Sequence, residues 1–315
     1  VHHKLIEEIL GVEEDRERSV EEIHSGIYPL NIAKSDFGEE ELQAKSMEIL
    51  ADLAPWLEKT DAVSNSRLRM LTGFSRIEWL DWLRHRSSTP LAGRIGRMIS
   101  AEMKLTGSIP IAIEWEALGH DSNGIEISLP EELSSNGEGE LPPLRLRGEI
   151  DRVDLLPFNS EMNIFVDESG SNSVAPIRLK DSGWKPRRLI IIRDIKTSEG
   201  EPIKRHSLGL LEELQLALYA RAWEVAHPGD LVVAAGISVI GHNTDHFLEV
   251  SYHLPTESSS LKFGDLSHQQ TRELHRFPDE EPGEESDSFR AWLAQRLSTA
   301  LATAAGAANG RVHPT

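Results

Sequence analysis

The chain has 315 residues, no cysteine, 39% hydrophobic residues and a formal net charge of −19 at pH 7. This length has room for one large domain or two small ones, and the hydrophobic content is ordinary for a globular protein. The lack of cysteine excludes disulfides, iron–sulfur clusters and thiolate zinc sites. No apolar run approaches the roughly 20 residues of a membrane-spanning helix, and no secretory signal is visible. We therefore expect a cytoplasmic protein without a membrane partner.

The acidic charge is unevenly distributed along the chain. A net charge of −19 is unfavourable for a nucleic-acid-binding protein, whose affinity comes largely from basic side chains that neutralise phosphates. Basic residues nevertheless gather between 145 and 193, where they predict either a local basic surface or scattered charges that flank strands. These residues are Arg145, Arg147, Arg152, Lys180, Lys185, Arg187, Arg188 and Arg193.

The first elements are predicted to be helical. Residues 1–60 are acidic, have a weak apolar period and carry no chemical motif, which predicts an N-terminal helical segment. Residues 64–84 follow as a clearer amphipathic helix, with Ser64 or Ser66 as its N-cap. A further helix is predicted over residues 91–105.

The middle of the chain alternates apolar and polar residues in the manner of strands. Residues 109–117 and 125–129 alternate on either side of a turn-rich segment, and residues 144–156 alternate again. The apolar parity changes within the last of these stretches, which predicts a β-bulge near Asp151. The run from 189 to 192 is continuously apolar and predicts a strand that is buried on both faces.

The remaining elements are a helix, a hairpin and a terminal helix. Residues 207–227 have the strongest helix pattern in the chain, and a Pro-Gly-Asp sequence ends it. Residues 231–240 and 247–254 predict a hairpin, and residues 287–307 predict the terminal helix.

This order of elements predicts an α/β fold, with a central mixed β-sheet flanked by helices. Antiparallel neighbours come first, and a helical crossover then leads to further strands. We place an additional N-terminal helical segment over residues 1–60 and one domain over 61–315, with its core at about 91–255.

Two charged residues stand at the end of the buried strand. Asp194 and Lys196 have Ile195 between them, so a period of two puts both charged side chains on one face. Burying a carboxylate and an ammonium costs free energy unless the pair has a function. A metal-dependent nuclease uses such a pair, because the carboxylate binds a divalent cation and the lysine orients or activates the attacking water. The alternative is an ordinary ion pair at a strand end.

Two further motifs stand in order with this pair. GEIDRVD carries Asp151 on the preceding strand, and LQLALYARAW carries Gln215 and Tyr219 four residues apart on one helix face. Together with RDIKTS, these motifs resemble the PD-(D/E)XK nuclease superfamily, and within it the RecB and AddB branch of exonuclease domains, over residues 61–255. The resemblance implies a restriction-endonuclease-like core.

The resemblance also implies roles for these residues. Asp151, Asp194 and the backbone carbonyl of Ile195 would bind Mg²⁺ or Mn²⁺, and Lys196 would orient or deprotonate the nucleophilic water. The two residues of the helix motif would pack beside the site and contact the backbone or DNA phosphates. The implied activity is exonucleolytic hydrolysis of DNA in repair or recombination, with DNA and a helicase domain or subunit as partners. Because the chain starts at Val1 rather than Met, we expect a fragment or a processed chain. The resemblance implies that it is part of a larger helicase–nuclease or repair protein.

The chain departs from the branch at two places. The branch often has a metal-site histidine on the helix before the strands, whereas residues 91–105 contain no histidine and offer Glu102 as the nearby ligand type. Phe74 and Ser75 stand where the branch has its first cluster cysteine and a proline. We therefore expect no iron–sulfur cluster, and aromatic packing in its place.

Two alternatives stay open within the same fold. A catalytically silent DNA-binding or scaffolding module would keep the fold without cutting DNA, and the missing histidine and the acidic charge favour it. An RNA or structure-specific nuclease would share the same ligand set, since the surrounding loops choose the substrate.

Overall fold

The structure is a computed structural model. It describes residues 39–53, 62–85, 93, 95–96, 109–118, 123–128, 143–156, 170–177, 179, 182–196, 214–239, 246–247 and 288–308. Most of the predicted segment 1–60 and of the predicted helix 91–105, including Glu102, lies outside the described residues.

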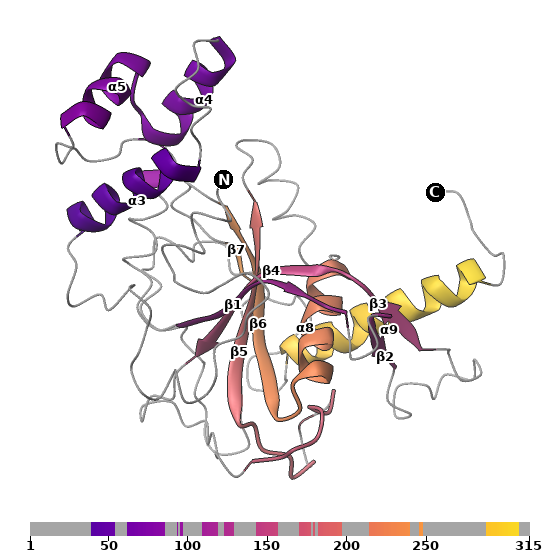
Figure 1. The fold of residues 1–315 in the computed structure, drawn as a ribbon. Helices are drawn as coiled ribbons and strands as arrows, with labels where there is room; N and C mark the ends of the chain where they lie inside the picture. The colour runs from indigo at the N-terminus through magenta and orange to yellow at the C-terminus, as the bar shows by residue number, and fades with distance from the viewer. Residues whose placement is uncertain are drawn as a thin grey trace.

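The fold is α/β, with a central mixed sheet that helices flank (Figure 1). The strands lie in the order β1-β4-β5-β6-β7, in which β5 and β6 are parallel and each other neighbouring pair is antiparallel. The strands are β1 (Ile109–Glu116), β4 (Glu149–Leu156), β5 (Arg188–Lys196), β6 (Asp230–Val239) and β7 (His246–Phe247). The predicted mixed sheet is therefore confirmed. Strand β7 pairs antiparallel with β6 as the predicted hairpin requires, and residues 248–254 of its predicted second strand lie outside the described residues.

Strand β5 is buried on both faces, as its apolar run predicts. Its side chains from Leu189 to Ile195 are all buried. Large β-branched side chains suit such a strand, and each fully buried isoleucine contributes roughly 1.5–3 kcal/mol to stability. Because this core fixes the strand on both sides, it also fixes the position of the charged residues at the end of β5.

Two helices pack beside the sheet. Helix α8 (Leu214–Ala226) stands between β5 and β6 in the chain and contacts both of them, and α9 (Ser288–Ala308) contacts α8. The predicted helix over 207–227 is confirmed from residue 214 to 226, and the predicted terminal helix is confirmed. In the described part of the chain, no helix has the length and apolar character that crossing a membrane requires.

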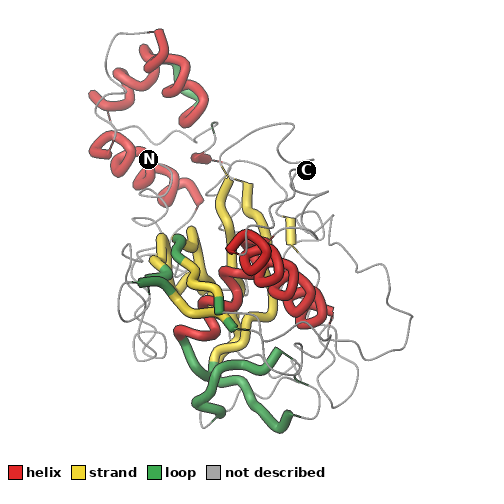
Figure 2. Tube along the Cα trace, turned by 90° about the vertical axis from the view of Figure 1, so that its right-hand side faces the viewer, coloured by secondary structure: helices red, strands yellow, loops and turns green. Residues whose placement is uncertain are grey.

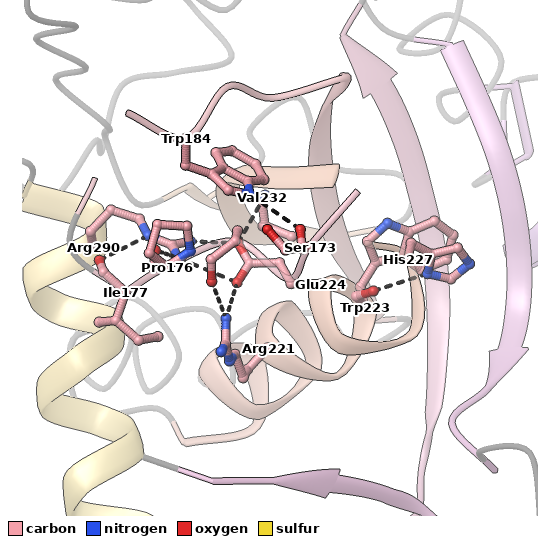
Figure 3. A network of polar contacts seen from close by, with 11 residues as sticks. Ser173, Pro176, Ile177, Trp184, Arg221, Trp223, Glu224, His227, Val232 and Arg290 are labelled. Atoms are coloured by element: carbon pink, nitrogen blue, oxygen red, sulfur yellow. Dashed lines mark hydrogen bonds and ion pairs between the residues drawn. The ribbon is translucent and has the colours of Figure 1, made fainter. Parts of the chain in front are cut away.

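A buried ionic network joins α8, α9, β6 and the segment before β5 (Figure 3). The Glu224 carboxylate accepts hydrogen bonds from Arg290 (2.5 Å), from Arg221 (3.0 Å) and from the backbone N–H of Val232 (3.2 Å). The two guanidinium groups also donate to backbone carbonyls of residues 175–177. Burial lowers the pKa of Arg221, and the Glu224 charge opposes this shift.

A second sheet pairs β2 (Ile125–Ile127) with β3 (Leu144–Leu146) in antiparallel fashion. The stretch 144–156 is therefore two strands, and residues 147 and 148 connect one sheet to the other. The change of apolar parity, between Ile150 and Val153, lies within β4, where both side chains are fully buried, so β4 has buried apolar residues on both faces.

The predicted β-bulge near Asp151 is wrong. The pairing of β4 with β5 is regular from Arg152 to Leu156, and the register shift next to β4 lies in β1, between Pro110 and Ala112. The extra residue belongs to the partner strand, so the sequence of β4 could not reveal it.

Three helices form a group that lies beyond the end of the sheet towards which β5 and β6 run (Figures 1 and 2). They are α3 (Glu39–Leu53), α4 (Ala62–Thr72) and α5 (Arg76–His85). The predicted single helix over 64–84 is wrong, because Gly73 adopts a φ of 82° and separates α4 from α5. Neither Ser64 nor Ser66 is an N-cap, since α4 begins before both of them.

The start of α5 has a capping box. Glu78 N donates to Ser75 Oγ (3.4 Å), and Ser75 N donates to Glu78 Oε2 (2.6 Å). The hydrogen bond from the Ser75 backbone holds the pKa of Glu78 below its ordinary value. Phe74 is buried just before this box, and Trp79 stacks on Trp82 with ring centroids 5.3 Å apart.

Candidate metal centre

Acidic residues from three neighbouring strands lie side by side in the central sheet. Asp151 is on β4, which lies between β1 and β5. The register of β1 with β4 puts Glu114 opposite Asp151. The register of β4 with β5 pairs Arg152 with Arg193. Continued by one residue, this register puts Asp194 opposite Asp151, on the side of β4 away from β1. Opposite residues of neighbouring strands share a face of the sheet, so the three positions form a row.

The carboxylates of Glu114, Glu149 and Asp151 form one group, in which a ligand atom of each lies within 4.8 Å of the others. Asp194 is not a member of this group. Oε1 of Glu114 is shielded from solvent. Charges at this separation repel one another by roughly 3 kcal/mol per pair at an effective dielectric constant of about 20. A divalent cation would relieve this repulsion, and carboxylate oxygens are the ligands that Mg²⁺ prefers.

Glu114 has an unusual backbone conformation for a strand residue. Its φ is 51°, in the left-handed region, whereas strand residues have strongly negative φ values. The other described residues with positive φ are glycines. Holding a side chain in this region costs roughly 1–3 kcal/mol, and such residues gather at functional sites. The strained residue of β1 is therefore the one that contributes a carboxylate to the group.

Asp151 contacts the backbone of the Asp-x-Lys segment directly. The N–H of Ile195 donates a hydrogen bond to Asp151 Oδ2, with a donor–acceptor distance of 2.5 Å. The structure thus brings Asp151 next to the residue whose carbonyl is expected to bind the metal. Asp194, which precedes Ile195, is buried.

Lys196 is the last residue of β5. Its backbone pairs with Val239 of β6, which fixes the end of the strand in the middle of the sheet. Its side chain lies outside the described residues. The prediction that it shares a face with Asp194 therefore still stands on the period of two.

Helix α8 presents Gln215 and Tyr219 to the start of β4. Gln215 Nε2 donates a hydrogen bond to the Tyr219 hydroxyl (3.0 Å). The Tyr219 ring lies against Gly148, where an added Cβ would be 3.0 Å from Tyr219 Cε1 and 3.3 Å from the hydroxyl oxygen. Because Gly148 directly precedes Glu149, the hydrogen-bonded pair packs next to the strand that carries the acidic group.

The second aspartate of the GEIDRVD motif belongs to a different cluster. Asp154 is fully buried and accepts hydrogen bonds from Arg152 (2.7 and 3.1 Å) and from Arg193 (2.8 Å). Strand alternation puts Asp154 on the face of β4 opposite Asp151. These two arginines neutralise a buried carboxylate and are not available as a basic surface.

Other basic residues between 145 and 193 are also engaged in pairs. Arg188 makes a bidentate pair with Asp230 (2.7 Å for both contacts), and Arg145 lies 3.5 Å from Glu126. These pairs agree with the interpretation as charges that flank strands, whereas Arg147, Lys185 and Arg187 are exposed and leave the alternative of a local basic surface open.

Sequence reasoning missed Glu114 and Glu149. Glu149 is two residues before Asp151, so the period of two could have placed it on the same face. Glu114 interrupts a strand that is otherwise mainly apolar, which was a weaker signal. Its position opposite Asp151 depends on the pairing of β1 with β4, which no local pattern shows.

A scan against models of known protein families gives no match, and a search of curated proteins finds no significant similarity to the chain. The function is therefore argued from the chemistry and geometry of the site.

Proposed function

We propose that this chain is a metal-dependent nuclease that hydrolyses DNA phosphodiester bonds, with a restriction-endonuclease-like core. The observation that carries the proposal is the row of Glu114, Asp151 and Asp194 on three neighbouring strands, one of which ends in Asp-x-Lys. A nuclease that works with a divalent cation needs hard oxygen ligands beside a lysine. The motif resemblance to the RecB and AddB branch supports exonucleolytic cleavage in DNA repair or recombination, together with a helicase partner.

The donor set fits Mg²⁺ or Mn²⁺. Asp151, Asp194 and the Ile195 carbonyl are the ligands that the motifs imply, and all of these donors are hard oxygens. Glu114 and Glu149 supply further carboxylates within 4.8 Å of Asp151. They would supply ligands in place of the histidine that the branch often has, and Glu102, the alternative, lies outside the described residues. When bound, the cation would stabilise negative charge on the phosphate and make a bound water more acidic.

The residues of the chain would orient the reacting groups. The Ile195 N–H holds the Asp151 carboxylate in place through the 2.5 Å hydrogen bond. Lys196 would hold the nucleophilic water by donating a hydrogen bond and would balance negative charge in the transition state. The Gln215–Tyr219 pair, which packs on Gly148, would present polar atoms to the phosphate oxygens next to this position.

A nuclease assay with a labelled linear duplex tests this proposal. The wild-type chain should cleave DNA with Mg²⁺ or Mn²⁺ and not with EDTA, and Asp194→Asn and Lys196→Ala should each cleave about 100-fold more slowly. Lys185→Ala is the matched control, because Lys185 is an exposed lysine in the segment before β5 and should leave the rate unchanged.

The same assay decides against the proposal if wild type does not cleave with either metal, or if both variants cleave as fast as wild type. A chain that binds the duplex and does not cleave it would be the silent DNA-binding module. The acidic net charge and the missing histidine are the observations that favour this second function.

A further inference from the structure

We propose that the helical hairpin of α4 and α5, residues 62–85, binds the phosphate backbone of duplex DNA. The choice of DNA as the occupant rests on the proposed nuclease function. The binding itself does not require cleavage, so the two proposals can fail separately.

The hairpin is basic within an acidic chain. It contains four arginines against two acidic residues, a balance of +2, whereas the whole chain has a charge of −19. The arginines are Arg67, Arg69, Arg76 and Arg84. Three of the four are exposed, and Arg76 is partly exposed. A surface of this kind complements a polyanion, because arginine binds phosphate oxygens through charge-assisted hydrogen bonds.

The two acidic residues of the hairpin are engaged locally. Glu78 accepts a hydrogen bond from the Ser75 backbone and also interacts with the charge of Arg69, and Asp81 lies 3.2 Å from the His85 ring. The neighbouring helix α3 carries exposed Glu48 and Asp52, so the basic surface ends at the hairpin. This boundary limits the expected footprint to a few phosphates.

The position of the hairpin suits a substrate that reaches the candidate metal centre. The hairpin lies beyond the end of the sheet towards which β5 runs, and this is the end of β5 that carries Asp194 and Lys196 (Figures 1 and 2). The arginines within β4 and β5 form ion pairs inside the sheet, Arg152 and Arg193 with Asp154 and Arg188 with Asp230. The hairpin therefore adds exposed arginines at the end of the sheet where the site lies, and exposed Arg147 directly before β4 lies at the same end.

Apolar side chains stand among these arginines. Ile77 is 80% exposed and Met70 is 40% exposed, and they are the exposed large hydrophobic residues of the described chain. Ile77 directly follows Arg76, and Met70 directly follows Arg69. Proteins that bind and bend duplex DNA often combine basic side chains with apolar residues, such as isoleucine and methionine, that insert between base steps.

The hairpin favours a duplex over a single strand. Proteins that bind single strands stack the bases on exposed aromatic rings, whereas Phe74, Trp79 and Trp82 of the hairpin are all buried. A duplex also has one negative charge per about 1.7 Å of its axis, which is the denser target for a surface with few arginines.

Binding to a fluorescent duplex of about 20 base pairs, measured by anisotropy in EDTA, tests this inference without cleavage. The double variant Arg69→Ala/Arg84→Ala should bind the duplex about tenfold more weakly than wild type. The slope of log Kd against log salt concentration should fall by about 2, one for each arginine removed. The matched control is Lys185→Ala/Arg187→Ala, which removes two exposed basic residues before β5 and should leave both values unchanged.

Several outcomes would overturn the inference: no duplex binding by wild type, equal binding by the hairpin variant, or an equal loss in the control. Tighter binding to a single strand, to duplex RNA or to vesicles with anionic lipids would do the same. Circular dichroism melting of each variant shows that it is folded. Duplex binding that depends on the hairpin, in a chain that does not cleave with Mg²⁺, would support this inference and contradict the nuclease proposal.

Discussion

At the scale of single residues, two features of Glu114 lower the stability of the folded chain. Its φ of 51° costs free energy for a residue with a side chain, and its carboxylate lies within 4.8 Å of two others. Folding does not require either feature, since a neutral residue could occupy the same place in β1. Their combination at one position, opposite Asp151, is what we expect of a residue that is kept for binding a cation.

The first prediction concerns the charge of this residue. Glu114→Gln keeps the shape of the side chain and removes a repelled charge, so it should raise the free energy of unfolding in EDTA by about 1–2 kcal/mol. An excess of Mg²⁺ should stabilise wild type more than the variant, because the cation binds the folded site. Thermal unfolding with and without Mg²⁺ measures both effects. Glu116→Gln, an exposed position on the same strand, is the control, and a Glu114→Gln variant less stable than wild type in EDTA would refute the repulsion.

Whether a residue of the candidate site could be predicted depended on whether a short stretch of sequence around it carries a recognisable motif. Asp151, Asp194, Lys196, Gln215 and Tyr219 were predicted because each stands at a fixed place in a short motif. Glu114 could not, because its place in the row depends on a pairing between strands that are far apart in the chain.

At the scale of elements, the capping box at the start of α5 makes a pH-dependent contribution to stability. The Ser75 backbone N–H holds the pKa of Glu78 below its ordinary value of 4.5. A lowered folded-state pKa means that the stabilisation is complete above pH 4.5 and is lost as the pH falls through the folded-state pKa. The charge also lies in the first helical turn, where the helix dipole favours a carboxylate.

The second prediction follows from this box. The difference in Tm between wild type and Glu78→Gln should be constant near neutral pH and should shrink as the pH falls below 4.5. An NMR titration of the Glu78 side chain provides the direct value of its pKa. A midpoint at or above 4.5 in the folded chain would be inconsistent with the hydrogen bond from Ser75.

The elements that sequence patterns predicted correctly are those with one strong period. Strand β5 and helices α8 and α9 have long, consistent apolar patterns, and all three were found. The helix over 64–84 was wrong because Gly73 continues the apolar period while its φ of 82° ends the helix. The stretch 144–156 was wrong because alternation does not show that a strand changes sheets.

At the scale of the whole molecule, Glu224 joins segments that are far apart in the chain. The carboxylate is fully buried and links Arg221 on α8 with Arg290 on α9. Figure 3 shows Glu224 between these two arginines, with Pro176 and Ile177 beside Arg290. The network therefore links α9 to α8, the helix that carries the Gln215–Tyr219 pair.

The third prediction tests this network. Glu224→Gln leaves two buried guanidinium groups without their countercharge, so it should lower the free energy of unfolding by about 3–5 kcal/mol. Glu126→Gln is the control, because it breaks an exposed pair with Arg145 and should cost about 1 kcal/mol or less. Urea denaturation of both variants measures the two values. Equal losses in the two variants would mean that the buried network does not stabilise the assembly of α8 and α9.

The dependence of DNA cleavage on Mg²⁺ concentration tests the central claim, that carboxylates from three neighbouring strands bind the cation needed for hydrolysis. We predict that the rate for wild type rises with Mg²⁺ and saturates. Glu114→Gln should need about tenfold more Mg²⁺ to reach its half-maximal rate, a loss of about 1.4 kcal/mol in binding free energy. Cleavage that persists in EDTA, no cleavage at any Mg²⁺ concentration, or identical Mg²⁺ curves for the two chains would contradict the claim.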